Sequence, residues 1–141
     1  MLALDYYDHL LANIPFGAEK VVLRALSGHI GLDHAIQKPD LIAASKRLGA
    51  TFKDERQLRI IIVRLRKAGV PVCASSGESG SFLAASLEEY REFRGREYIK
   101  KIIDMRETVD AMDQHIRRMF PQEYQDYQRE KSNCAGQPPL I

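Results

Sequence analysis

Apolar and polar residues alternate with a helical period between about residues 54 and 68. The apolar members, which recur at i, i+3, i+4 and i+7, are Leu58, Ile61, Ile62 and Leu65. This spacing places them on one face of an α-helix. Asp54 can accept hydrogen bonds from the unpaired N–H groups of the first turn, and Gln57 stands where a capping-box partner belongs. Gly69 can adopt the left-handed conformation that ends a helix. The pattern therefore predicts a helix from Asp54 to Ala68.

After this helix, the spacing at which apolar residues recur changes from about 3.6 residues to 2 residues. Residues 70–74 and 82–85 are short apolar runs of the kind that form strands. Residues 75–81 between them are rich in Gly and Ser, which favour turns. We therefore expect a helix, a sharp stop and a β-hairpin with a Gly/Ser tip, in this order.

This helix and hairpin resemble the recognition helix and wing of winged helix-turn-helix DNA-binding domains. The resemblance is carried by LRKAGVPV at 65–72 and GSFL at 80–83. It is similar in particular to the amino-terminal domain of biotin-operon repressors, but has Ser81-Phe82 where those domains usually have Gly-Tyr. The resemblance covers only this unit, so it implies DNA binding and no biotin chemistry. The wing contacts that it implies come from Ser76, Gly77, Ser79, Gly80 and Ser81.

Residues 17–53 predict the other helices of a three-helix core. A broad apolar face suggests a helix that opens at Gly17 and runs to about residue 30. Residues 40–49 indicate a short second helix, which Gly49 stops. The connection from Gly49 to Asp54 would then be the turn of a helix-turn-helix. The expected fold class is mainly α with a small β-hairpin, and the winged helix-turn-helix domain is expected to span residues 17–85.

Residues 1–16 are expected to form an N-terminal helical arm, with a short helix over residues 4–13. The apolar face of that helix consists of Leu4, Tyr7, Leu10 and Leu11. This face predicts packing against the domain or against a partner subunit. A second role stays open, because Tyr6, Tyr7 and His9 could form a platform on which bases stack.

The net charge of +2 is distributed unevenly along the chain. Residues 38–67 carry nine basic and three acidic groups, whereas the segments before and after each have a net charge of −2. A basic block on the predicted recognition helix suits a polyanion, because each neutralised phosphate releases counterions. A solvated basic face is the alternative interpretation. The predicted DNA-binding residues are Lys46, Arg47, Lys53, Arg56, Gln57, Arg59, Arg64 and Lys67.

The face of this helix opposite the apolar stripe carries side chains that can read bases. Arg can bind guanine and Gln can bind adenine, each through two hydrogen bonds. Arg66 flanks the same face. Ile60 and Val63 also project there, and they could contact thymine methyl groups, the N-terminal arm or a protein partner. The sequence leaves these alternatives open.

A long helix is predicted from Ser86 to about Phe120, since Ser86 and Glu89 match a capping box. Its apolar residues alternate in steps of four and three, which is typical of a coiled coil. The members of this seam are Tyr98, Ile102, Met105, Val109, Met112, Ile116 and Met119. We predict a homodimer through residues 86–120, with folding back onto the chain's own domain as the alternative. Residues 121–141 are expected to be a polar tail, disordered at its end.

The sequence contains no nucleophile elbow, phosphate loop or zinc signature. His29 and His34 are five residues apart, which does not place them on one helix face, and no nearby ligand completes a metal site. We therefore expect no enzymatic activity, no metal and no cofactor. Cys73 and Cys134 are expected to be reduced. No apolar run is long enough to span a bilayer, and the acidic N-terminus does not fit a signal peptide, so a soluble cytoplasmic protein is expected.

Two functional hypotheses follow from these patterns. The first is a dimeric, sequence-specific double-stranded DNA-binding protein, a transcriptional regulator of the small kind found in bacteria and their phages. The second is a winged helix that serves as a protein–protein interaction module in a replication complex or another nucleoprotein complex.

Overall fold

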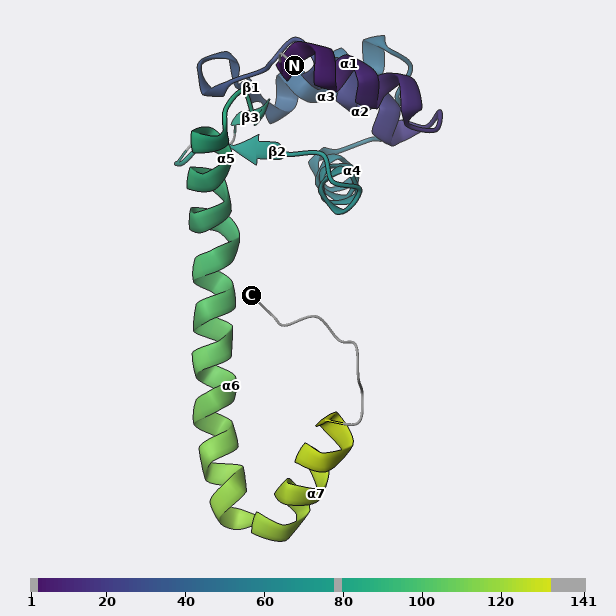
Figure 1. Cartoon of the computed structure of the whole chain (residues 1–141). Helices are drawn as coiled ribbons and strands as arrows, with labels where there is room; N and C mark the ends of the chain where they lie inside the picture. The colour runs from purple at the N-terminus through teal and green to yellow at the C-terminus, as the bar shows by residue number, and fades with distance from the viewer. Residues whose placement is uncertain (1–2, 78–79, 133–141) are drawn as a thin grey trace. The chain divides into compact units, whose positions relative to one another are not determined.

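The computed structural model describes residues 3–77 and 80–132, which form a mainly helical chain with one small sheet (Figure 1). The chain divides into two compact units, one that ends at Glu97 and one that begins at Tyr98. The elements of the first unit are α1 (Ala3–Asn13), α2 (Ala18–Leu26), η1 (Leu32–His34), β1 (Ile36–Gln37), α3 (Lys38–Arg47), α4 (Glu55–Lys67), β2 (Val72–Ala74), β3 (Gly80–Leu83) and α5 (Leu87–Arg94). A π-helical turn, η2 (Gly95–Ile99), follows, and the second unit contains α6 (Lys100–Met119) and α7 (Pro121–Ser132).

The core of the first unit lies where α2 packs against α1, α3 and α4. Leu58, Ile61, Ile62 and Leu65 of α4 are all buried in it, which confirms the predicted apolar face. The Asp54 carboxylate accepts a hydrogen bond from the Gln57 N–H at 3.0 Å, so the predicted N-cap is also confirmed. Gly69 has a φ of 99°, as expected for the residue that ends this helix.

The sheet is antiparallel and has the strand order β1-β3-β2. Cys73 pairs with Phe82 across the hairpin, and Ile36 of β1 pairs with Ser81. A Cβ atom on Gly80 would lie 3.0 Å from the Ser75 hydroxyl oxygen and 3.2 Å from the Ala35 Cβ atom. The backbone of β3 thus approaches its neighbours closely, and a larger residue would fit here only if Ser75 and Ala35 shifted by a few tenths of an ångström.

Two predicted helix boundaries in the first unit are wrong. α2 ends at Leu26 and not near residue 30, because the chain from His29 to Gly31 hydrogen-bonds to Leu83 of β3. α3 begins at Lys38, and Pro39 lies in its first turn instead of before it. The fixed φ of proline and its missing N–H group suit this position.

The N-terminal arm packs into the core of the first unit. Tyr7 is only 3% exposed, and its hydroxyl group donates a hydrogen bond of 2.6 Å to the Ala84 carbonyl oxygen. This agrees with the expected packing against the domain, and it excludes Tyr7 from an exposed stacking platform. Leu4, which was placed on the packed face, is instead 52% exposed.

Replacing Tyr7 with Phe should lower the free energy of unfolding by about 1–3 kcal/mol, because the buried Ala84 carbonyl loses its donor. Burial raises the pKa of Tyr7 above its usual value of about 10. Its contribution to stability is therefore complete below about pH 10 and declines as the pH rises further. Urea denaturation at pH 7 and at pH 10.5 should show a smaller alkaline loss for Tyr7→Phe than for the wild type. The exposed Tyr6→Phe serves as the control, and an equal effect of both substitutions would contradict this role of Tyr7.

The predicted long helix begins as expected. The Ser86 hydroxyl group accepts a hydrogen bond from the Glu89 N–H at 3.2 Å, and the Glu89 carboxylate accepts one from the Ala85 N–H at 2.9 Å. Helical structure then extends from residue 87 to 119, with the π-helical turn beginning at Gly95. Within the described residues, Ile102 of the seam is partly buried and the other six seam residues are exposed.

In the second unit, α7 packs against α6 around Tyr124. The Arg117 guanidinium lies over the Tyr124 ring at 4.9 Å, and the Gln128 side-chain amide donates to the Tyr124 hydroxyl group at 3.0 Å. The predicted polar tail thus begins with a helix, α7, which extends to Ser132 and which the sequence analysis did not identify. The expected disorder at the chain's end falls on residues 133–141, outside the described residues.

Candidate nucleic-acid interface

The predicted DNA-binding residues lie on α3, on α4 and on the connection between them. Lys46 and Arg47 are in the last turn of α3, and Lys53 directly precedes the N-cap of α4. The other five are Arg56, Gln57, Arg59, Arg64 and Lys67 of α4. All eight side chains are exposed. The five on α4 are exposed because this helix turns its apolar stripe into the core and its basic face away from it.

The outer face of α4 contains a shallow hollow of ≈ 340 Å³. Its six lining residues are Arg56, Arg59, Ile60, Val63, Arg64 and Lys67. Four of them carry a positive charge, and the other two are apolar. We refer to this set as the α4 surface.

Two arginines of the α4 surface form ion pairs with acidic residues. Arg59 lies 3.4 Å from Glu55, one turn earlier on the same helix, and Arg64 lies 3.6 Å from Glu19 on α2. Both arginine side chains are more than half exposed. Solvent-exposed ion pairs of this kind contribute at most about 1 kcal/mol, so either guanidinium can exchange its partner for a phosphate.

Arg66, which the sequence places beside the basic face, has a different role. Its Nε atom donates a hydrogen bond of 2.7 Å to the Val72 carbonyl oxygen, and its guanidinium lies over the Phe93 ring at 4.9 Å. These contacts join α4 to β2 and α5. Arg66 therefore stabilises the domain, and the expectation that it flanks the basic surface is wrong.

Gln57 is already engaged in capping α4. Its side-chain oxygen accepts a hydrogen bond of 2.7 Å from the Lys53 N–H, while its own N–H donates to Asp54. Paired binding to adenine needs this oxygen as an acceptor for the base amino group. Reading adenine in the predicted way would thus compete with the cap of the same helix.

The expected wing residues are only partly at the hairpin tip. Ser76 and Gly77 are exposed, and Gly77 has a φ of 82°. Gly80 and Ser81 belong to β3 and are buried, with Ser81 only 4% exposed, which corrects their expected place in an exposed tip. Ser79 lies outside the described residues.

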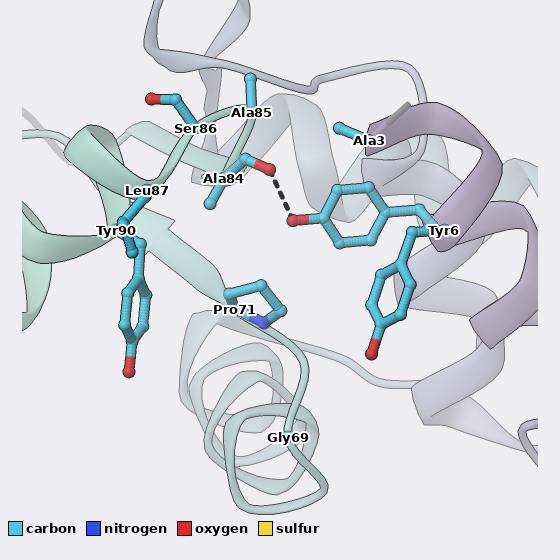
Figure 2. Close-up of a pocket in the computed structure, with 10 residues that line it drawn as sticks. Ala3, Tyr6, Gly69, Pro71, Ala84, Ala85, Ser86, Leu87 and Tyr90 are labelled. Carbon is cyan, nitrogen blue, oxygen red and sulfur yellow. Dashed lines mark hydrogen bonds between the residues drawn. The ribbon is translucent and has the colours of Figure 1, made fainter. Parts of the chain in front are cut away.

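A second hollow, of ≈ 530 Å³, lies between α1, the segment that connects α4 to β2, the segment after β3 and the start of α5. Figure 2 shows Tyr6 and Tyr90 on either side of Pro71, with the dashed line marking the hydrogen bond that Ala84 accepts from Tyr7. None of the residues that line this hollow carries a charge at neutral pH. It therefore lacks the positive charges that the α4 surface presents to a phosphate.

The described residues contain no cluster of three or more potential metal ligands. The ring of His29 is within hydrogen-bonding distance of the His34 backbone carbonyl oxygen, at 2.8 Å. Cys73 is a buried free thiol, and burial raises its pKa to about 11. At neutral pH this thiol is protonated and poorly nucleophilic.

The fold is thus that of a mainly helical unit with a three-stranded antiparallel sheet, followed by a long helical segment. No family model, curated protein or solved structure matches the chain. In the part of the chain that the structure describes, no helix is long and apolar enough to cross a membrane.

Proposed function

We propose that the first unit is a winged helix-turn-helix domain and that the protein binds double-stranded DNA sequence-specifically as a transcriptional regulator. The element order from α2 to β3 supports this proposal: a helix, a short strand, two helices joined by a turn, and a hairpin. The strand order β1-β3-β2 places the hairpin and the short strand in one sheet, as a winged helix requires. In such a domain α4 enters the major groove, and α3 crosses the backbone beside it.

The exposed basic face of α4 is the observation that carries the proposal. It combines with the cations at the end of α3 to give one positive region in a chain whose net charge is only +2. Side chains on this region can reach phosphates and base edges together when the helix lies in a groove. The small size of the domain is consistent with the regulatory role that we propose.

The affinity for a 30-base-pair duplex should fall linearly, on logarithmic scales, as the salt concentration rises. Each neutralised phosphate contributes about −0.9 to this slope, so four to six contacts predict a slope of about −4 to −5. Fluorescence anisotropy between about 50 and 200 mM salt measures it. Absence of binding at the lowest salt concentration, or an affinity independent of salt, would contradict DNA binding.

We further propose a homodimer through the seam, of which Tyr98 lies in η2 and the other six residues lie on α6. The exposure of its apolar residues supports a partner helix. Met, Val and Ile side chains at heptad spacing would be buried between two such helices, and this burial would stabilise the dimer. A two-fold pair would present two copies of α4 to two half-sites, and the binding free energies of the half-sites would combine.

A protein–protein interaction module is the second candidate function. The specific observation in its favour is the exposure of Ile60 and Val63 in the centre of the basic surface. Such apolar side chains can form the centre of an interface with an acidic protein. The salt experiment separates the two candidates, because this module would not retain a DNA duplex at low salt.

A further inference from the structure

Two apolar side chains occupy the centre of the α4 surface, where contact with phosphates alone would need none. Ile60 is 44% exposed and Val63 is 42% exposed, although the same helix buries four other apolar residues on its opposite face. No element in the described part of the chain covers them. The N-terminal arm, one of the partners that the sequence left open, instead packs into the core through Tyr7.

The order of side chains along this face is cation, apolar, apolar, cation. Arg56 lies one turn before Ile60, and Lys67 lies one turn after Val63. An α-helix rises by about 1.5 Å per residue, so Ile60 and Val63 are separated by about 4.5 Å along its axis. This separation is close to the rise of about 3.4 Å between stacked bases on one strand. The pair can therefore contact the same base or two neighbouring bases.

The chemistry of the major groove limits what such a pair can contact. The base edges there present hydrogen-bond donors and acceptors, together with one apolar group, the C5-methyl of thymine. A donor or acceptor buried against Ile or Val would lose its hydrogen bonds to water without replacement. The thymine methyl group loses none, and its burial is favourable.

We propose that Ile60 and Val63 contact thymine methyl groups in the major groove, so that the preferred DNA site has thymine beneath the centre of α4. This inference rests on the proposed DNA binding and adds the base that the α4 surface prefers. The surrounding cations favour a nucleic acid over a neutral apolar partner for these two side chains.

A pair of synthetic duplexes tests this inference. One is a 24-base-pair duplex of alternating deoxyadenosine and thymidine, and the other has deoxyuridine in place of every thymidine. The two have the same phosphates and the same base-pairing groups, and differ by the methyl groups. Burial of one methyl group corresponds to about a fourfold change in affinity. The 141-residue chain should bind the thymidine duplex about 4- to 15-fold more tightly at about 50 mM salt.

The double variant Ile60→Ala/Val63→Ala should bind the two duplexes equally. Both side chains are exposed, so the variant should unfold at nearly the same temperature as the wild type, which circular dichroism checks. Leu32→Ala is the matched control, because Leu32 is also exposed and apolar but lies on η1, outside the α4 surface. This control should keep the preference for thymidine.

Equal binding of the two duplexes by the wild-type protein would overturn the inference and leave DNA binding intact. A double variant that keeps the wild-type preference would also overturn it, because other groups would then read the methyl groups. Failure to bind either duplex would overturn both the inference and the proposed function, and would favour a protein partner for Ile60 and Val63.

Discussion

The double variant Arg56→Ala/Arg59→Ala should bind a DNA duplex at least about 30-fold more weakly than the wild-type protein. Each arginine that contacts a base contributes about 1–3 kcal/mol, and a tenfold change in affinity corresponds to about 1.4 kcal/mol. Both side chains are exposed on the outer face of α4, and the only ion pair involved, between Arg59 and Glu55, is itself exposed in the described structure. The loss should therefore reflect lost DNA contacts and not a damaged fold.

Arg91→Ala/Arg94→Ala is the matched control for this variant. It removes the same two positive charges from exposed positions of α5 in the same unit. Fluorescence anisotropy should show an affinity within about threefold of the wild type, because neither arginine lines the α4 surface and exposed charges are partly screened by salt. Equal losses in both double variants would mean that overall charge, and not the α4 surface, determines binding.

The salt dependence of the α4 variant separates two kinds of contact. If Arg56 and Arg59 neutralise phosphates, the slope should become less negative by about 0.9 for each residue. If they bind base edges, the affinity should fall with a smaller change in slope and with weaker discrimination between sequences.

The double variant Val109→Lys/Ile116→Lys should sediment as a monomer under conditions in which the wild-type protein is a dimer. Both residues occupy heptad position 'a' of the predicted seam, whereas the methionines occupy position 'd'. A β-branched side chain at position 'a' would pack against the partner helix. A dimer would have to bury four lysine ammonium groups, each at a cost of several kcal/mol without an acidic partner. Analytical ultracentrifugation across a concentration series measures the expected loss of association.

Ala111→Lys/Gln114→Lys is the control for the seam. It adds two lysines to exposed positions of α6 that lie outside the a and d positions, and it should leave the oligomeric state unchanged. An unchanged state in the seam variant would remove the α6-mediated dimer. The seam residues would then pack within the second unit, where Met105, Val109 and Lys131 of α7 line a hollow of ≈ 560 Å³.

Local patterns were sufficient to predict α4 almost completely. Its buried stripe follows from the spacing of four apolar residues, and its ends follow from Asp54 and Gly69, which act on the backbone within a few residues. The capping box at Ser86 is local in the same sense. The basic face of α4 was therefore predictable, because the side opposite a buried stripe is exposed.

The features that the sequence analysis missed or misplaced have a common origin in contacts between residues far apart in the sequence. β1 is only two residues long, so it has no alternating pattern, and it exists because β3 pairs with it. The early end of α2 depends on Leu83, more than fifty residues later. The α7 helix depends on Tyr124 packing against α6, which the polar composition of residues 121–132 did not indicate.

The sequence by itself determined which helix carries the basic face, which four residues that helix buries, and where it begins and ends. Only the tertiary structure decided that Arg66 contacts Val72 and Phe93 and that Tyr7 donates a hydrogen bond to Ala84. It also decided that Ile60 and Val63 stay exposed. The physical reason is the range of the interactions. Helical period and capping act within a few residues. The tertiary fold, in contrast, decides which group a long polar side chain hydrogen-bonds to and whether an apolar side chain is buried.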